Sequence, residues 1–557
     1  MRPTTARTDG RLRRRGPAAR RAGWILLLGT WVGLLGCRRE QLSSPEVSAS
    51  EGFRPARTAE LYFTTSVLGE IEPCGCTSHP LGGLPKLATV VEQGGPHRAL
   101  VDSGALLLPE TGIDELTRPQ HRAKAALIAR AYRRLGAAAI NLAPSDLSEG
   151  LDLLESFQRE GAVPLVSAVA RPVGEGVPGV ATAFVREIGG IRFGITGGAL
   201  PEEVAAASDE AVALELGPVL RAQVESLRAS GAEIIVVLAH LPLPEARVIA
   251  EAIPAIDLLI RGPGSPIESE PAAPFRVGPV IVAEAGRRGQ YVGRARFALG
   301  TRAPERPLPL DDGGAERAAE RARLERRIAA LDADIERLSK SEAQTAAVTA
   351  RKGMRARLVS QLEGLGASSD APTGPHVEVT IIPLDEEIAD DDDMQQSLTA
   401  YYQQLRRMNL ERGDTVACVA PEGQPTYAGN AACVACHAEA GAVWRGTKHA
   451  LAWETLESRG KHYDLTCVGC HTVGFRKPGG FCRLDVAKPF EDVGCENCHG
   501  PGSAHVAAPE EVSLDRAARP EVCGQCHVPE HSDTFDFESY LPRILGPGHG
   551  RPVDGGL

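Results

Sequence analysis

The stretch "CVGCHTVGFRKPGGFCRLDVAKPFEDVGCENCHGPGSAH", from Cys467 to His505, contains the pattern Cys-x-x-Cys-His twice. One further copy precedes it and another follows it. The four copies are Cys433, Cys436 and His437; Cys467, Cys470 and His471; Cys495, Cys498 and His499; and Cys523, Cys526 and His527. Aromatic residues make up 4% of the chain. Some of the core is therefore expected to be filled by something other than Phe and Trp.

Three kinds of site use such residues. Two thiols three positions apart can bond to both vinyl groups of one haem, and the following histidine can then bind the iron. A zinc ribbon also uses Cys-x-x-Cys pairs, but it needs no histidine directly after each pair. A disulfide framework, which an exported chain allows, predicts no such histidine either. The pattern predicts four covalent haem c groups with proximal His437, His471, His499 and His527.

Haem iron that transfers electrons usually takes a sixth ligand. We expect the distal ligands among His449, His505 and His549, with His462 and His531 as weaker candidates. His505 follows a Gly-Pro-Gly loop that can fold the chain back over a neighbouring haem.

The segments "YAGNAACVACH", "KHALAWETL", "VGCENCHGPGSAH" and the last "CGQCH" resemble the tetrahaem cytochrome c-554 family (the cytochrome c-552/4 domain) over about residues 427–549. The resemblance implies a mainly α-helical domain around packed haems that relays electrons, typically in the oxidation of small nitrogen compounds. It also implies three haems with two histidine ligands each and one five-coordinate haem. His471, without an obvious distal partner nearby, would bind that open haem. The short last segment makes His549 the least constrained candidate.

The N-terminus reads as a signal peptide, residues 1–36. An arginine-rich segment precedes the apolar stretch Trp24–Gly36, which is too short to span a bilayer as an ordinary helix. The stretch ends in "LLGC", which resembles the bacterial lipobox and marks Cys37 for lipidation; an ordinary signal peptide with a chance cysteine is the alternative. We expect an exported lipoprotein, held by Cys37 at the periplasmic side of a bacterial membrane or at the cell surface. Residues 37–59 read as a polar tether.

Residues 60–300 alternate apolar runs with helical spacing, which indicates a layered α/β domain. The expected strands are 61–68, 98–103, 138–143, 163–168, 193–198, 233–240, 256–262 and 279–285, and the expected helices include 122–136 and 219–231.

This region also resembles the calcineurin-like metallophosphoesterases of the 5′-nucleotidase branch, through "LYFTTSVLGEIEP", "LVDSGALLL", "NLAPSDLSEG", "VVLAHLP", "DLLIRGPGSP" and "IVAEAGRRGQYVGR". That family holds two metal ions with Asp and His residues. The corresponding positions here are Ser66, Leu68, Ala105, Pro144, Ser145, Pro263 and Ser265, with only Asp146 and His240 able to bind a metal. We expect a degenerate domain without a di-metal centre and without phosphatase or nucleotidase activity.

"EPCGCTSHPLGGLPK" follows the first strand and carries Cys74, Cys76 and His79. Cys-x-Cys with a nearby histidine can bind a soft metal ion or act as a redox thiol pair. Cys418 and Cys482 are also unassigned, so the four cysteines can equally form two disulfides. Both interpretations stay open.

Residues 314–365 are expected to form a helical hairpin. Leu324, Ile328, Leu331, Ile335 and Leu338 recur as an a/d seam over two heptads, and a second helical stretch follows. An intramolecular hairpin is favoured over a dimer because the seam is short. Residues 366–425 form a connector with a strand and a helix, and residues 426–557 the tetrahaem domain.

The net charge of −11 argues against nucleic acid as a partner. The leading hypothesis is an electron-transfer protein with redox partner proteins, in which the α/β domain serves as a docking or sensing platform. One alternative is a haem oxidoreductase that acts on a small nitrogen or sulfur compound at an open haem. The other is a ligand-binding redox sensor.

Overall fold

The chain is described by a computed structural model that covers residues 53–549. Within this range it leaves out residues 74–79, 162, 169, 173–179, 210, 263–270, 312–313, 340–344, 365–373, 412–418, 483, 485–487, 516–518, 529–531 and 533–534. The predictions for the signal peptide, Cys37, Cys74, Cys76, His79, Cys418 and His531 fall outside the described residues and stay predictions. Among the helices in the described part, none is long and apolar enough to cross a membrane.

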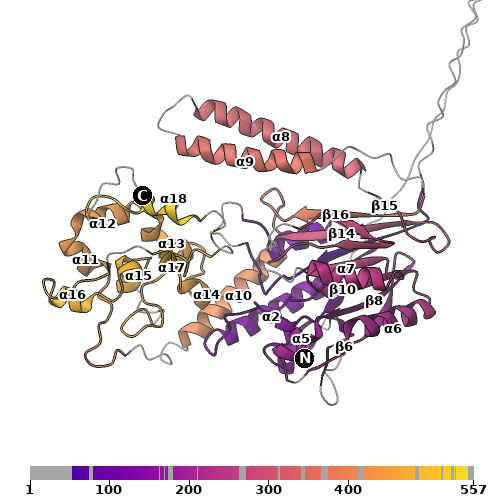
Figure 1. The fold of residues 1–557 in the computed structure, drawn as a ribbon, viewed down its shortest axis with the longest axis horizontal. Coiled ribbons are helices and arrows are strands. Elements are labelled where there is room, and N and C mark those ends of the chain that lie inside the picture. Colours follow the sequence, from indigo (N-terminus) through magenta and orange to yellow (C-terminus); the bar gives the residue numbers. More distant parts are fainter. Residues whose placement is uncertain are drawn as a thin grey trace, which may run out of the picture. The chain divides into compact units, whose positions relative to one another are not determined.

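Two mixed β-sheets form the centre of the α/β domain (Figure 1). In spatial order, the eight-stranded sheet contains β15 (Leu310–Asp311), β16 (His376–Pro383), β14 (Tyr291–Leu299), β1 (Arg57–Thr64), β2 (Arg98–Asp102), β3 (Ala137–Asn141), β4 (Leu165–Val166) and β6 (Val180–Ala181). The six-stranded sheet contains β12 (Phe275–Val277), β13 (Val280–Ala283), β11 (Leu258–Gly262), β10 (Ile234–His240), β8 (Ile191–Ala199) and β7 (Ala183–Ile188). A separate small ladder pairs β5 (Ala170–Pro172) with β9 (Ala211–Ala213).

The central strands are parallel and buried on both faces. In β10 all seven residues are buried, and the strand pairs in parallel with β8 on one side and β11 on the other. A strand covered on both faces needs a continuous apolar run, which is the pattern "IIVVLAH" shows. In the eight-stranded sheet, β1, β2, β3 and β4 are parallel neighbours in the same way. The strands expected from the sequence are therefore confirmed, with boundaries shifted by a few residues.

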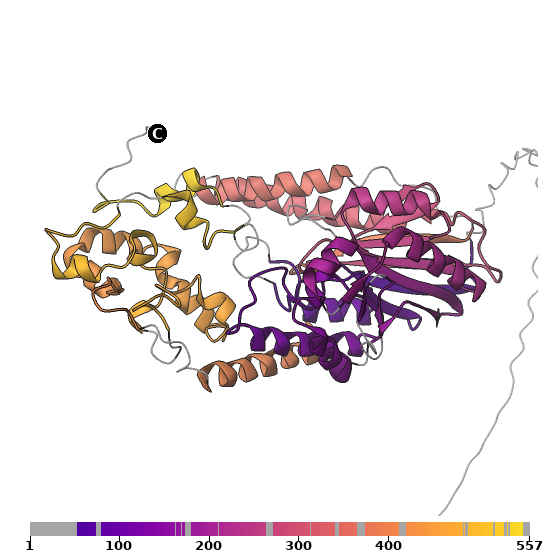
Figure 2. The same cartoon turned by 60° about the horizontal axis from the view of Figure 1, so that its bottom comes forward.

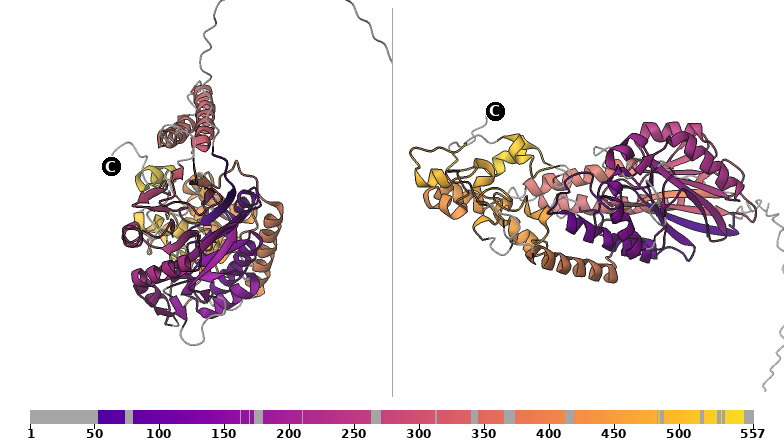
Figure 3. Two further views of the ribbon diagram at one scale, coloured as in Figure 1. Left: turned by 90° about the vertical axis from the view of Figure 1, so that its right-hand side faces the viewer. Right: turned by 90° about the horizontal axis from the view of Figure 1, so that it is seen from below.

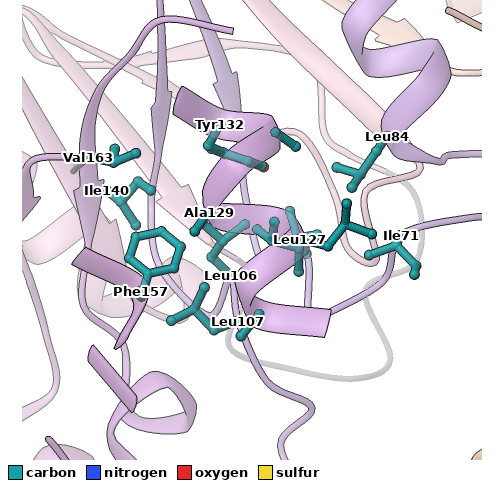
Figure 4. Close-up of a cluster of buried hydrophobic side chains, with 14 of the residues drawn as sticks. Ile71, Leu84, Leu106, Leu107, Leu127, Ala129, Tyr132, Ile140, Phe157 and Val163 are labelled. Atoms are coloured by element: carbon teal, nitrogen blue, oxygen red, sulfur yellow. The ribbon is translucent and has the colours of Figure 1, made fainter. Parts of the chain in front are cut away.

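Helices cover the outer faces of the sheets, as the two views in Figure 3 show. The α/β domain contains α1 (Leu84–Glu92), α2 (Arg118–Arg134), α3 (Pro144–Leu147), α4 (Leu151–Gly161), α5 (Pro201–Ala207), α6 (Leu216–Ala229), α7 (Leu243–Ala252) and α10 (Asp392–Glu411). Leu127 of α2 and Phe157 of α4 pack in one core with Ile140 of β3 (Figure 4). Phe193 and Phe297 meet edge-to-face between the sheets, with ring centres 5.1 Å apart. Residues of α6 and α7 form a third core on the other face of the six-stranded sheet. The layers are thus helix, sheet, sheet and helix.

The α/β core continues beyond residue 300, where the sequence analysis placed its end. Strand β16 pairs antiparallel with β14 over its whole length, from Tyr291 opposite Pro383 to Ala298 opposite His376. Leu398 and Leu405 of α10 are buried in the same core as α1 and α2. The expected connector strand and helix therefore belong to the α/β layers. The sequence hides this because the paired strands are separated by the helical hairpin.

The hairpin consists of α8 (Gly314–Leu338) and α9 (Thr345–Gly364), which lie side by side (Figure 2). Arg351 pairs with Asp334 at 3.5 Å and Arg355 with Asp332 at 2.5 Å. Since the partner number falls as the position on α9 rises, the two helices run antiparallel. The prediction of an intramolecular hairpin agrees with these contacts.

In its described residues, the C-terminal region contains only short helices. They are α11 (Asn430–Cys436), α12 (Ala438–Arg445), α13 (Ala452–Glu457), α14 (Leu465–Val468), α15 (Cys495–His499), α16 (Ser503–Ala507), α17 (Pro520–Cys523) and α18 (Phe537–Tyr540), with 3₁₀ turns at Lys448–Leu451, Lys488–Phe490 and Leu541–Arg543. Its apolar core consists of Trp453, Val468 and Phe481 with a few half-buried neighbours. The helical character expected from the sequence is confirmed.

Candidate functional site

Each Cys-x-x-Cys-His copy lies on a helix or helical turn. The backbone N–H of His437 donates to the carbonyl of Cys433 at 2.9 Å, and that of His527 donates to Cys523 at 2.8 Å. The third copy lies within α15. Residues three and four apart share one face of a helical turn. Both thiols and the imidazole of a copy therefore face the same side, as attachment to one haem requires.

The eight motif cysteines are free thiols, and none of them is fully buried. The thiol of Cys433 lies next to that of Cys495, and the thiol of Cys470 lies next to that of Cys526. The first copy is thus adjacent to the third, and the second to the fourth. Cys482, in contrast, is disulfide-bonded.

Three proximal histidines are held by hydrogen bonds at Nδ1. This atom is 2.5 Å from the Ala452 carbonyl in His471, 2.6 Å from the Asp515 carbonyl in His499, and 2.9 Å from Ser532 Oγ in His527. A carbonyl oxygen can only accept, so Nδ1 of His471 and of His499 carries the proton. Their Nε2 atoms are then free to bind a metal, with the ring orientation fixed by the second bond.

Two imidazole pairs fit the two sides of a haem iron. The ring centres of His437 and His505 are 6.3 Å apart, and those of His449 and His527 are 6.1 Å apart. With metal–imidazole bonds of about 2 Å and about 1 Å more to each ring centre, two axial imidazoles are expected about 6 Å apart. Nδ1 of His505 also donates to the Val512 carbonyl at 2.6 Å, which leaves its Nε2 for iron. The residues present therefore fit haem c.

The remaining histidines differ in their surroundings. Burial lowers the pKa of His549, and the charge of His499 lowers it further. His462 packs against Tyr463 and Trp453 at ring-centre distances of 4.0 and 5.8 Å, as a core histidine does. In the described part of the chain, no histidine ring stacks near His471 as His505 does near His437.

Glu496, inside the third copy, is a functional candidate that the sequence analysis missed. It is 3% exposed and accepts backbone N–H groups of Ala428, Gly429 and Gly502 at 2.7–2.8 Å. These contacts fix the start of α11 and the loop that leads to His505. The signal in the sequence was a carboxylate between the two cysteines of a copy.

In the α/β domain, the positions that the sequence resemblance aligns with phosphoesterase metal ligands have an unusual backbone. Ser66, Leu68 and Ala105 have φ angles of 46°, 60° and 57°. Such left-handed conformations cost about 1–3 kcal/mol each in residues other than glycine and cluster at functional sites. Leu68 and Ala105 form a small apolar cluster with Ala143. Within the described residues, no group of three His, Cys, Asp or Glu side chains could hold a metal ion. The absence of a di-metal centre stays a prediction, because Pro263 and Ser265 are not described.

Polar side chains at the same strand ends are buried. Burial raises the pKa of Asp102 well above its ordinary value, and that of Asp146 to about 6. Asp146 accepts the backbone N–H groups of Ala105, Leu107 and Ala143. Burial, then the charges of Arg287 and Arg261, lowers the pKa of His240 to about 4. His240 is therefore a neutral imidazole at neutral pH.

Comparison with known families agrees with the haem geometry. A family model described as "Cytochrome c554 and c-prime" matches residues 432–500. This region is a c-type cytochrome domain, the class of protein that binds haem c covalently and transfers electrons. The cytochrome c-554 of Nitrosomonas europaea is 36% identical over 109 residues, which cover 17% of this chain and 44% of that protein. The C-terminal part of the chain is thus similar to the cytochrome c554 family, as its sequence indicated, and it spans less than half of the length of this relative.

Solved structures similar to the chain include phosphoesterases. The 5′-nucleotidase precursor from Thermus thermophilus is 17% identical with a TM-score of 0.44, over 64% of this chain and 60% of that chain. The calcineurin-like phosphoesterase YfkN from Bacillus subtilis is 13% identical with a TM-score of 0.41, over 62% of this chain and 97% of that chain. The sequence of residues 60–300 resembles the same group. At this level of similarity, nothing follows about activity.

Proposed function

We propose that the protein is an electron-transfer lipoprotein whose cytochrome region carries four haem c groups. The observation that carries this proposal is the pairing of imidazoles at iron-bridging distance, 6.3 Å for His437 with His505 and 6.1 Å for His449 with His527. Two histidines on one iron favour electron transfer, because no coordination site remains for a substrate. The contacts between motif cysteines support close packing of the haems.

In this proposal His437 and His505 bind the first haem, His527 and His449 the fourth, and His499 and His549 the third. The chain's own residues fix these rings through Nδ1. The bound haems would supply iron that changes between two oxidation states. His462 is left as a core residue.

His471 supports a second candidate function. Its Nδ1 is anchored on the Ala452 carbonyl, and no described histidine stands opposite its ring at the distance seen in the other pairs. A haem on His471 would then be five-coordinate and could bind a small nitrogen or sulfur compound. The protein would in that case be an oxidoreductase.

The α/β domain is proposed to be catalytically inactive as a phosphoesterase and to serve as a docking or sensing platform. Supporting this, residues without metal-binding side chains, Ser66, Leu68 and Ala105, stand at ligand positions of the related enzymes. Export, attachment to a membrane through lipidated Cys37, and redox partner proteins on the periplasmic side complete the proposal.

The decisive experiment is a haem count combined with the spin state. The full chain, matured by a c-type haem assembly system, is analysed by pyridine haemochrome assay and low-temperature EPR. Four covalent haems, all low-spin, are the result expected for pure electron transfer. Four haems with one high-spin signal that disappears in His471→Ala would favour the oxidoreductase. Zinc in place of haem would overturn both proposals.

A further inference from the structure

Two buried amide side chains lie together at one end of the helix pair formed by α2 and α10. At the other end of this pair, Arg134 of α2 binds Asp391, just before α10, at 2.6 Å. Near the start of α2 and the end of α10, Asn409 Nδ2 donates to Gln120 Oε1 at 3.3 Å. The two helices therefore run antiparallel. Gln120 is 0% exposed and Asn409 is 5% exposed, so both amides are in contact with protein rather than with solvent.

These amides bind a short segment of the cytochrome region. Asn409 Nδ2 donates to the Tyr463 carbonyl at 2.8 Å. Gln120 Nε2 donates to Asp464 Oδ1 at 3.0 Å, and Gln120 Oε1 accepts from the Leu465 N–H at 3.3 Å. Asp464 is itself 4% exposed. Three consecutive residues of the cytochrome region are thus hydrogen-bonded to side chains of the α/β domain.

The bound segment is the start of the helix that carries the second Cys-x-x-Cys-His copy. Asp464 is the N-cap of α14, and its side chain accepts a backbone N–H of the first turn, which stabilises the start of the helix. Its carbonyl accepts the N–H groups of Cys467 and Val468, both at 3.0 Å. The Val468 carbonyl in turn accepts the N–H of His471 at 3.1 Å. A short series of hydrogen bonds therefore leads from Gln120 to the proximal histidine of this copy.

Ion pairs flank the second copy on both sides. Before it, Lys461 Nζ lies 2.9 Å from Glu72, which also accepts from Tyr402 Oη of α10 at 2.5 Å. After it, Arg476 pairs with Asp114 at 2.5 Å. Both ion pairs are partly exposed to solvent and contribute little each. Together with the buried amides, however, they place all of these contacts on residues 461–476, which contain the second copy and none of the other three.

We propose that Gln120 and Asn409 are positioning residues for the haem of the second copy, so that the α/β domain forms part of the site around His471. They act by fixing the start of α14, on which Cys467 and the turn to His471 depend. This inference rests on the proposed attachment of a haem at the second copy. It gives the α/β domain a function beyond that of a docking or sensing platform.

A reduction potential is the property that such positioning changes. The protein shell around a haem controls the access of water, and thereby the potential of the iron. Without the bonds from Gln120, water can reach the buried start of α14. Water stabilises the oxidised, more highly charged state of the haem. Loss of the contact should therefore lower the potential of this haem and leave those of the other haems unchanged.

The test is a redox titration, monitored by EPR, of the full-length, haem-loaded protein. Gln120→Leu replaces the amide by an apolar group of similar size. We expect one haem component to shift to lower potential, while the others stay at their wild-type values. The component that shifts should be the one that changes in His471→Ala. Asn409→Leu, at the end of α10, should shift the same component, and it serves if Gln120→Leu fails to fold.

Gln404→Leu is the matched control, because it makes the same substitution at an exposed position of α10, and it should titrate like the wild-type protein. Wild-type potentials in both Gln120→Leu and Asn409→Leu would overturn the proposal. So would a shift of all components, or of a component other than that of His471.

Mass spectrometry of the wild-type peptide that contains Cys467 and Cys470 distinguishes this inference from the proposed function. A haem on this peptide, with unshifted potentials in the variants, would refute the positioning role alone. A peptide without haem would refute both the positioning role and the proposed haem at the second copy.

Discussion

The α/β domain and the cytochrome region of the same chain are stabilised in different ways. In the α/β domain, strands such as β10 are buried along their whole length, and three apolar cores join sheets and helices. In the cytochrome region the longest described helix has eight residues. The buried apolar residues described there are Ala452, Trp453, Leu456, Leu465, Val468, Val473 and Phe481. So small a core cannot offset the conformational entropy of the region. The contrast indicates that the first region folds on its own side chains, and we expect the second to need its haems.

The largest expected effect is that of haem removal. A chain produced without c-type haem maturation should keep a folded α/β domain but lose the structure of residues 426–549, because the motif helices then have too little core to pack on. Limited proteolysis followed by mass spectrometry measures this, with the matured chain as the control. If the haem-free cytochrome region resists protease as well as the matured region does, it does not need its haems to fold.

A core substitution in the α/β domain should destabilise that domain and leave the cytochrome region unchanged. Phe193 is fully buried against Phe297, so Phe193→Ala should lower the free energy of unfolding of this domain by about 3–5 kcal/mol. Denaturant unfolding followed by circular dichroism measures the loss. The Soret spectrum should stay unchanged, and Phe184→Ala, which removes a half-buried ring, should cost less. An equal cost for both variants would mean that the core between the sheets is not what stabilises the domain.

The next prediction concerns the axial histidine ligands of the haems in the cytochrome region. His505→Ala should convert one haem from low spin to high spin, because His437 loses the imidazole 6.3 Å from its own ring centre. Low-temperature EPR measures the change. His462→Ala is the matched control and should leave all spin states as they are, since His462 packs on Tyr463 and Trp453. A spin-state change in His462→Ala and none in His505→Ala would make His462 the axial ligand and His505 a packing residue.

The smallest expected effect is a pH dependence in the α/β domain. Burial, with a smaller contribution from Lys124, lowers the pKa of His121 from 6.5 to about 4. Between these two pH values the unfolded chain binds a proton at His121 that the folded chain does not. The stability advantage of the wild type over His121→Gln should therefore fall by roughly 1 kcal/mol per pH unit as the pH drops from about 6.5 to about 4.

Urea unfolding at pH 7, 6 and 5 measures that difference. His97→Gln, at an exposed histidine, is the control for replacing a histidine with glutamine. A stability difference between wild type and His121→Gln that does not change with pH would show that this side chain is hydrated in the folded protein.

Most strands were predictable from the sequence, and the haem attachment residues are predicted from it, because both depend on local patterns. The run "IIVVLAH" specifies a strand buried on two faces, and each Cys-x-x-Cys-His places its three groups on one helical turn. The extent of the α/β core was not predictable, since β16 joins β14 across the intervening hairpin. The choice among five distal histidines was not predictable either, because an imidazole finds its partner through the fold rather than through spacing.

The sequence by itself thus indicated a c-type cytochrome with covalent haem c, and it predicted that the α/β domain lacks most of the metal ligands of the family it resembles. Only the tertiary structure decided that His505 faces His437, and that Gln120 binds Asp464 beside the second copy. The physical reason is the separation along the sequence of the residues that form each site. Covalent haem attachment needs residues three and four positions apart, whereas the bond from Gln120 to Asp464 joins residues that only the folded chain brings together.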